Sequence, residues 1–188
     1  DWQAVIHQSS LFDVDCPELF SFAENDFTYS GILSDLERFY ANASEPFVLC
    51  GLSLGALLAL DYTIRHPEQI SSLILVGAQY KVPTRLIDFQ NLIFRCMPEN
   101  AFTDMGLSKH DTIKLSHSMR MLDFSPKLSE IHCPVSVICG KKDRANLKAA
   151  KQLHALLPQS HLHIIPDAGH EVNKDAPKAL AALIENCI

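Results

Sequence analysis

Residues 47–58 read Phe-Val-Leu-Cys-Gly-Leu-Ser-Leu-Gly-Ala-Leu-Leu. The apolar run 47–50 predicts a buried strand, and the apolar residues that follow predict a helix over 54–65. Between them, residues 51–55 form a Gly-x-Ser-x-Gly motif. A motif of this kind between a strand and a helix holds its serine on a sharp, strained turn, with the hydroxyl exposed above the end of the strand. The stretch therefore predicts an α/β fold in which Ser53 is either an exposed nucleophile or an ordinary serine of a glycine-rich strand-to-helix turn.

Strand and helix patterns alternate on both sides of this motif. Short apolar runs predict strands over 12–16, 47–50, 73–76, 135–139 and 161–165. Apolar residues at helical spacing predict helices over 34–40, 54–65, 145–157 and 174–187. Strands that alternate with helices are typical of a mostly parallel sheet flanked by helices, so the predicted fold class is α/β.

The alternation stops between residue 79 and about residue 127, where no β-branched run occurs. The pattern there is helical, with apolar residues on one side at Leu86, Phe89, Leu92, Ile93 and Met97. We expect residues 1–188 to form a single domain in which 79–127 is a small helical lid insertion.

The composition excludes several classes of protein. Of 188 residues, 47% are hydrophobic and 20% are charged, which is incompatible with disorder. The net charge of −6 argues against a nucleic-acid-binding surface, which is normally basic. No apolar run approaches the roughly 18 residues that a membrane-spanning helix needs. The expected partner is a small-molecule substrate, with no nucleic acid and no membrane span.

The cysteines indicate a reducing compartment, and hence a cytoplasmic location. None forms a Cys-x-x-Cys pair or a spacing typical of metal sites, and several lie inside apolar runs. A disulfide framework is not expected in a chain large enough to have a full core. The cysteines are Cys16, Cys50, Cys96, Cys133, Cys139 and Cys187.

A serine nucleophile needs a base, and the base needs a group that orients it. His170 follows the predicted strand 161–165, and Asp143 follows the predicted strand 135–139. Because parallel strands bring their carboxyl ends to one edge of the sheet, both residues should lie on the same edge as Ser53. Three such residues behind three predicted strands, in the chain order serine, aspartate, histidine, are far more specific than any one of them.

With these motifs the chain resembles the α/β-hydrolase family over most of its length, least across 79–127, where the family has its variable lid. The matching segments are GLSLG at 51–55, RHPEQISSLILV at 65–76, PVSVICGKKD at 134–143 and IIPDAGHEVNKDAP at 164–177.

The resemblance implies Ser53 as the nucleophile, His170 as general base and acid, and Asp143 as the residue that orients His170. It also implies the Leu54 backbone N–H as one oxyanion donor, with no metal or organic cofactor. The expected function is cleavage of a small ester or thioester through an acyl-enzyme on Ser53. Two alternatives stay open: a C–C bond hydrolase or lyase of the same fold, similar to menaquinone-pathway members, and a non-catalytic ligand-binding protein.

The chain departs from the family pattern at its beginning. The family normally has further strands, one of them between the strands predicted at 12–16 and 47–50, and a His-Gly-type loop that supplies a second oxyanion N–H. This sequence contains neither. We expect the numbered chain to be an incomplete copy of a longer enzyme, because a gap in the sheet would leave buried backbone groups unpaired. The alternative is a protein that has lost this segment and, with it, efficient catalysis.

Other candidate groups are weaker. His161 and His163 share one face of a predicted strand and could bind a metal, but the sequence offers no third ligand. Cys50 still lies within its strand rather than on the turn, so it is expected to be a core residue and not a nucleophile.

Overall fold

The computed structural model describes residues 2–9, 14–21, 26–105 and 107–187. Contacts between Cα atoms group the chain into two compact units. The first comprises residues 1–16, 43–80 and 124–188 and contains the sheet. The second comprises residues 17–42 and 81–123 and is helical.

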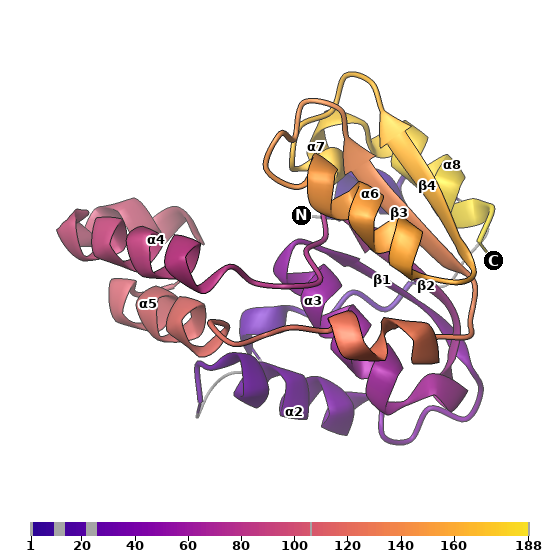
Figure 1. Cartoon of the computed structure of the whole chain (residues 1–188), viewed down its shortest axis with the longest axis horizontal. Coiled ribbons are helices and arrows are strands. Elements are labelled where there is room, and N and C mark those ends of the chain that lie inside the picture. Colours follow the sequence, from indigo (N-terminus) through magenta and orange to yellow (C-terminus); the bar gives the residue numbers. More distant parts are fainter. Residues whose placement is uncertain (1, 10–13, 22–25, 106, 188) are drawn as a thin grey trace. The chain divides into compact units, whose positions relative to one another are not determined.

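The sheet of the first unit has four parallel strands in the order β1-β2-β3-β4 (Figure 1). Its last residues are in register across the strands, with Leu52 opposite Val76, Val76 opposite Ile138, and Gly140 opposite Ile165. The carboxyl ends therefore meet at one edge, as predicted for parallel strands. The strands are β1 (Phe47–Leu52), β2 (Ile70–Val76), β3 (Val135–Gly140) and β4 (Ser160–Ile165).

Helices cover both faces of this sheet. Helix α3 packs on β1 and β2, and α6 packs on β3 and β4, whereas α1, α7 and α8 pack together against the opposite face. Among the described residues, no helix is long and apolar enough to span a bilayer. The helices of this unit are α1 (Gln3–Ile6), α3 (Leu54–Arg65), α6 (Leu147–Leu156), α7 (Val172–Asp175) and α8 (Pro177–Glu185), with 3-10 turns η2 (Pro67–Gln69) and η4 (Ser125–Glu130).

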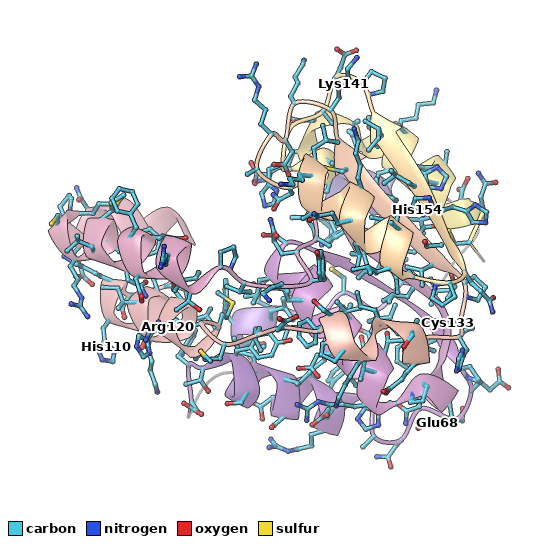
Figure 2. The ribbon with its side chains drawn as sticks, viewed as in Figure 1. Glu68, His110, Arg120, Cys133, Lys141 and His154 are labelled. Atoms are coloured by element: carbon cyan, nitrogen blue, oxygen red, sulfur yellow. The ribbon has the colours of Figure 1, made fainter. Side chains whose placement is uncertain are left out.

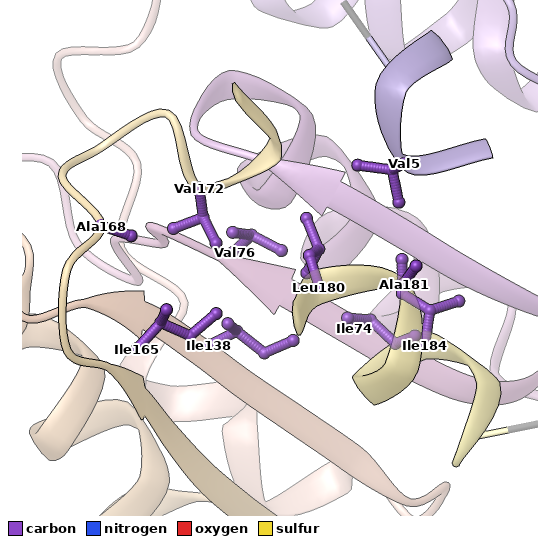
Figure 3. Packing of buried hydrophobic residues seen from close by; sticks show 10 residues of the cluster. All are labelled: Val5, Ile74, Val76, Ile138, Ile165, Ala168, Val172, Leu180, Ala181 and Ile184. Carbon is purple, nitrogen blue, oxygen red and sulfur yellow. The ribbon is translucent and has the colours of Figure 1, made fainter. Parts of the chain in front are cut away.

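A cluster of buried aliphatic side chains joins α1, α7 and α8 to the sheet (Figure 3). Ile74 and Val76 of β2 contribute to it, because residues two apart in a strand point to the same face. Leu73 and Leu75 alternate with them and are also fully buried, so both faces of β2 are covered. A strand buried on both faces explains why residues 73–76 are apolar without interruption.

Most predicted elements of this unit are confirmed, and three predictions are corrected. Residues 14–16 form no strand; their side chains are exposed, so the alternating pattern has no buried face, and residues 12 and 13 lie outside the described residues. The helix predicted over 174–187 is two helices, because Pro177 begins a new helix as its first residue. Strand β1 is half-buried rather than fully buried.

The second unit contains three helices and two 3-10 turns among its described residues. The side chain of Thr28 accepts a hydrogen bond from the Gly31 N–H and caps α2, which therefore begins earlier than residue 34, where the apolar spacing had placed it. Helices α4 and α5 pack side by side. On α4, Phe89, Leu92 and Ile93 of the predicted apolar stripe are exposed. The elements are η1 (Leu19–Ser21), α2 (Tyr29–Phe39), α4 (Thr84–Cys96), η3 (Glu99–Met105) and α5 (Lys109–Ser118).

Candidate active site

Ser53 is the single residue between β1 and α3, and it lies on a strained turn. Its φ of 55° and ψ of −112° are unusual for any residue with a side chain, and among the described residues no other non-glycine has a positive φ. The Ser53 N–H donates to the Val76 carbonyl at 3.0 Å, and the Ser53 carbonyl accepts from the Ala56 N–H. Strain held by such contacts is typical of functional sites.

The turn requires a glycine before the serine. A Cβ atom on Gly51 would lie 2.2 Å from the Gly55 carbonyl oxygen, which no real contact tolerates. The absence of a side chain therefore lets the first turn of α3 fold back against the end of β1.

Leu54 is the first residue of α3. An N–H at this position has no carbonyl partner within its own helix, and it lies at the positive end of the helix dipole. It directly follows Ser53 in the chain, so an N–H donor stands beside the serine where an oxyanion would develop.

Asp143 and His170 lie in the loops that follow β3 and β4, and backbone contacts hold these two loops together. The N–H groups of Lys141 and Lys142 donate to the carbonyls of Ile165 and Ala168, at 2.8 and 2.9 Å. Figure 2 marks Lys141 at this end of the sheet. A Cβ atom on Gly140 would lie 2.1 Å from the Gly169 carbonyl oxygen, so the close approach of the loops depends on glycine.

The side chains of His170 and Asp143 form a hydrogen-bonded pair, with 2.8 Å between His170 Nδ1 and Asp143 Oδ2. The Asp143 side chain is only 4% exposed, whereas that of His170 is 40% exposed. A carboxylate accepts only, so Nδ1 carries the proton, and in the neutral imidazole Nε2 then has the lone pair. Burial raises the pKa of Asp143, but hydrogen bonds from Asn146 and His170 outweigh it and hold that pKa below its usual value.

The end of β2 connects this pair to the serine. Val76 accepts the Ser53 N–H, and the next residue, Gly77, donates its N–H to the Ile138 carbonyl at 2.9 Å. A Cβ atom on Gly77 would lie 3.1 Å from both Cε1 and Nδ1 of His170. The ring of His170 therefore packs on Gly77, which directly follows Val76, the residue whose carbonyl accepts the Ser53 N–H. All three residues singled out in the sequence lie at the carboxyl edge of one sheet.

Two polar residues at this site were not predicted. Asn146 donates its backbone N–H to Asp143 Oδ1 at 3.1 Å and its side-chain amide to Asp143 Oδ2 at 2.8 Å. Gln79 donates to Asn146 Oδ1 at 2.6 Å. An aspartate shortly before a predicted helix is a signal of a local side chain–backbone hydrogen bond, which the sequence offered for Asp143 and Asn146. Gln79 follows the predicted strand 73–76, so the argument that placed Asp143 and His170 at the carboxyl edge also places Gln79 there, but no motif singles it out.

The remaining candidates have no role in this arrangement. Loss of water around the Cys50 thiol raises its pKa to about 12, so it is a thiol and not a reactive thiolate at neutral pH. Within the described ranges, no three His, Cys, Asp or Glu side chains are grouped so as to hold a metal ion.

Comparison with known proteins places these features in a wider group. A family model described as "Alpha/beta hydrolase family" matches residues 3–183. The chain is 25% identical to the "Putative carbamate hydrolase RutD" of Escherichia coli O26:H11 (strain 11368 / EHEC), over 86% of this chain and 73% of that protein.

Solved structures share the fold. The esterase EaEST from Exiguobacterium antarcticum superposes with a TM-score of 0.73 at 20% identity, over 86% of this chain and 74% of that one. The enol-lactonase from Burkholderia xenovorans LB400 superposes with a TM-score of 0.74 at 17% identity, over 85% and 72%. The similarity thus extends over most of the length of each protein.

Proposed function

Because the chain belongs to the alpha/beta hydrolase family, we propose that it is a serine hydrolase that cleaves a small ester or thioester through an acyl-enzyme on Ser53. In this proposal His170 is the general base and acid, Asp143 orients its imidazole, and the Leu54 N–H is one oxyanion donor. No metal or organic cofactor takes part in the reaction.

One observation carries the proposal. A serine with φ of 55° stands at the carboxyl edge of the sheet that also bears a histidine–carboxylate pair 2.8 Å apart. Each feature alone has an ordinary structural explanation, since turns and buried ion pairs are common. Three side chains from three separate loops at one sheet edge supply a nucleophile, a base and an orienting acid, which are the parts that acyl transfer requires.

In the acylation step, the neutral His170 with its proton on Nδ1 uses Nε2 as the base. Nε2 of His170 takes the proton of the Ser53 hydroxyl while Oγ attacks the carbonyl carbon, and the carbonyl oxygen becomes an oxyanion near the Leu54 N–H. The negative charge of Asp143 stabilises the imidazolium that forms. The imidazolium then protonates the leaving alcohol or thiol as its bond to carbon breaks, which leaves the acyl group on Ser53.

Deacylation repeats these steps with water. His170 removes a proton from the water as its oxygen attacks the acyl carbon, and it returns that proton to Ser53 as the acid leaves. The proteins similar to this chain include ones named esterase, enol-lactonase and carbamate hydrolase. All three names describe cleavage of a carbonyl carbon from a heteroatom, which supports an ester-like substrate.

The direct test is covalent labelling by a fluorophosphonate, which phosphonylates an activated serine and releases fluoride. We expect stoichiometric labelling of the full-length protein at Ser53 and none in Ser53→Ala. Ser72→Ala removes a buried serine hydroxyl from the neighbouring strand β2 and should label like the parent protein.

A panel of short-chain p-nitrophenyl esters and thioesters then tests the substrate class. Hydrolysis that disappears in Ser53→Ala supports the proposal. Absence of labelling in the folded full-length protein, with Ser53→Ala behaving identically, would overturn it. Labelling without hydrolysis of any ester or thioester would overturn the ester assignment and favour a lyase or C–C bond hydrolase.

A further inference from the structure

Asn146 occupies the first position before α6 but does not cap that helix. Asparagine is among the preferred capping residues, because its side-chain oxygen can accept a free N–H of the first turn. Here that role is not used, and the side chain is turned toward the site. With Asn146 only 9% exposed, its amide is committed to protein partners rather than to water.

The partners determine how the two amides are oriented. Asp143 Oδ2 can only accept, so the group of Asn146 that lies 2.8 Å from it must be the NH₂. Oδ1 of Asn146 then points to Gln79, and the group of Gln79 that lies 2.6 Å from it must also be an NH₂. The chain of donors therefore runs in one direction, from Gln79 through Asn146 to Asp143.

The same oxygen of Asp143 serves both Asn146 and His170. Asn146 Nδ2 lies 3.0 Å from His170 Nδ1, and each of these nitrogens lies 2.8 Å from Asp143 Oδ2. The other oxygen, Oδ1, accepts the Asn146 backbone N–H. With donors on both oxygens the carboxylate cannot rotate without losing a hydrogen bond, and the direction along which it accepts from His170 is restricted.

We propose that Gln79 and Asn146 are positioning residues, which hold Asp143 in the orientation that accepts the hydrogen bond of His170 Nδ1, and so orient the imidazole for its role as the base of Ser53. This inference rests on the proposed function. Neither residue reacts with substrate. Asn146 acts through Asp143, and Gln79 acts only through Asn146, by restricting rotation of its amide. Second partners of this kind are known to tune catalytic and metal-binding histidines by fixing their orientation and tautomer.

Replacement of Asn146 by leucine tests the main contact. Leucine has a similar size but no donor, so Asp143 loses the side-chain hydrogen bond and keeps the backbone one. We expect the rate constant of fluorophosphonate labelling, and kcat for an ester substrate, to fall about 10- to 100-fold while KM stays within about twofold. Labelling of Asn146→Leu should still reach completion, only more slowly. If Asn146 served folding alone, the variant would instead show a smaller labelled fraction at an unchanged rate per folded molecule.

Gln79→Leu tests the Gln79–Asn146 contact. It also tests whether Gln79 acts on Asp143 only through Asn146, in the hydrogen-bond chain Gln79–Asn146–Asp143 that we call the relay. We expect a smaller decrease in the labelling rate, about 3- to 10-fold, and no additional decrease when the change is combined with Asn146→Leu. Gln152→Leu is the matched control. It removes a glutamine of α6 whose side-chain oxygen accepts an exposed hydrogen bond from the Tyr80 hydroxyl, and it should label like the parent protein.

Two results would overturn the relay. One is labelling of Asn146→Leu at the parental rate. The other is full additivity of the two substitutions, since a residue that acts only through Asn146 can have no effect once Asn146 is replaced.

A measurement that needs no activity separates this inference from the proposed function. The proton on His170 Nδ1 should give a low-field NMR resonance, which is identified by its absence in His170→Ala. We expect this proton to exchange with water at least about tenfold faster in Asn146→Leu than in the parent protein. Unchanged exchange overturns the relay. If the exchange accelerates but the parent protein is not labelled at Ser53, the relay stands and the proposed function fails.

Discussion

Gly77 shows how one residue without a side chain can govern the geometry of the site. Its φ of 56° belongs to the left-handed region, which glycine enters at little cost. Gly77 also directly follows Val76, whose carbonyl accepts the Ser53 N–H. Gly77 itself packs against the ring of His170. The position therefore combines a backbone requirement with a steric one, and alanine violates both.

Gly77→Ala should lower the free energy of unfolding by about 1 to 2 kcal/mol through backbone strain. Its Cβ, 3.1 Å from two ring atoms, should also displace the His170 imidazole and slow labelling of Ser53. Urea denaturation and labelling kinetics measure the two effects separately.

The control is the same substitution in a His170→Ala background, where the steric part has no ring to act on. We expect the destabilisation there to be smaller than in the parent protein. Equal destabilisation in both backgrounds would show that the contact with the ring has no energetic weight.

Helix α6 is amphipathic, and its two faces differ in what they contribute to stability. Leu153 is fully buried against the sheet, whereas Leu156, three residues later, is 46% exposed. The apolar residues at 147, 150, 153 and 157, at helical spacing within the predicted range 145–157, form the buried or half-buried side of this helix. The helix is thus held by burial of that face on β3 and β4, and its first turn follows Asp143 and Asn146.

Leu153→Ala and Leu156→Ala form a matched pair that tests this view. The first creates a cavity and should reduce the free energy of unfolding by about 2 to 5 kcal/mol. The second should change it by less than about 1 kcal/mol. Chemical denaturation of both variants gives the comparison, and similar losses in the two would contradict packing of α6 by its 150–153 face.

At the scale of the whole molecule, the buried carboxylate of Asp143 links stability to pH. Burial alone would raise its pKa, but the hydrogen bonds from Asn146 and His170 lower the pKa of the folded state below that of the unfolded chain. A lowered pKa means that the folded state holds the charged form more tightly. The resulting stabilisation is present above the unfolded pKa of about 3.9 and is lost as the pH falls through the folded-state pKa.

We therefore expect the difference in unfolding free energy between the parent protein and Asp143→Asn to decrease as the pH falls below the unfolded pKa of about 3.9. Denaturant titrations at a series of pH values measure it. Asp167→Asn is the control, because its side chain is exposed and its contact with Lys142, at 3.6 Å, is a surface pair of small effect. A difference independent of pH would contradict the inferred charge state of Asp143.

The order of elements follows from local patterns, and so it could be predicted. Strands β2 to β4 and helix α3 appear where the apolar runs and helical spacing placed them. Burial on both faces explains the uninterrupted apolar runs of β2 and β3, whereas β4 is mostly half-buried. Local pattern failed at residues 14–16, where alternation exists without a buried face, and at Pro177, where one apolar stripe continues across two helices. The spacing of apolar residues alone shows neither whether a face of residues 14–16 is covered nor where one helix ends and the next begins at Pro177.

By itself the amino-acid sequence determined the α/β class, the serine turn at 51–55, and the edge of the sheet at which Asp143 and His170 lie, since parallel strands leave little choice of edge. Only the tertiary structure decided which side chains meet there. Gln79 and Asn146 are 67 residues apart, and their contact depends on the separate paths of the loops after β2 and β3. Contacts of a few ångströms between segments far apart in the sequence are set by the packing of the whole sheet, and local sequence patterns do not specify that packing.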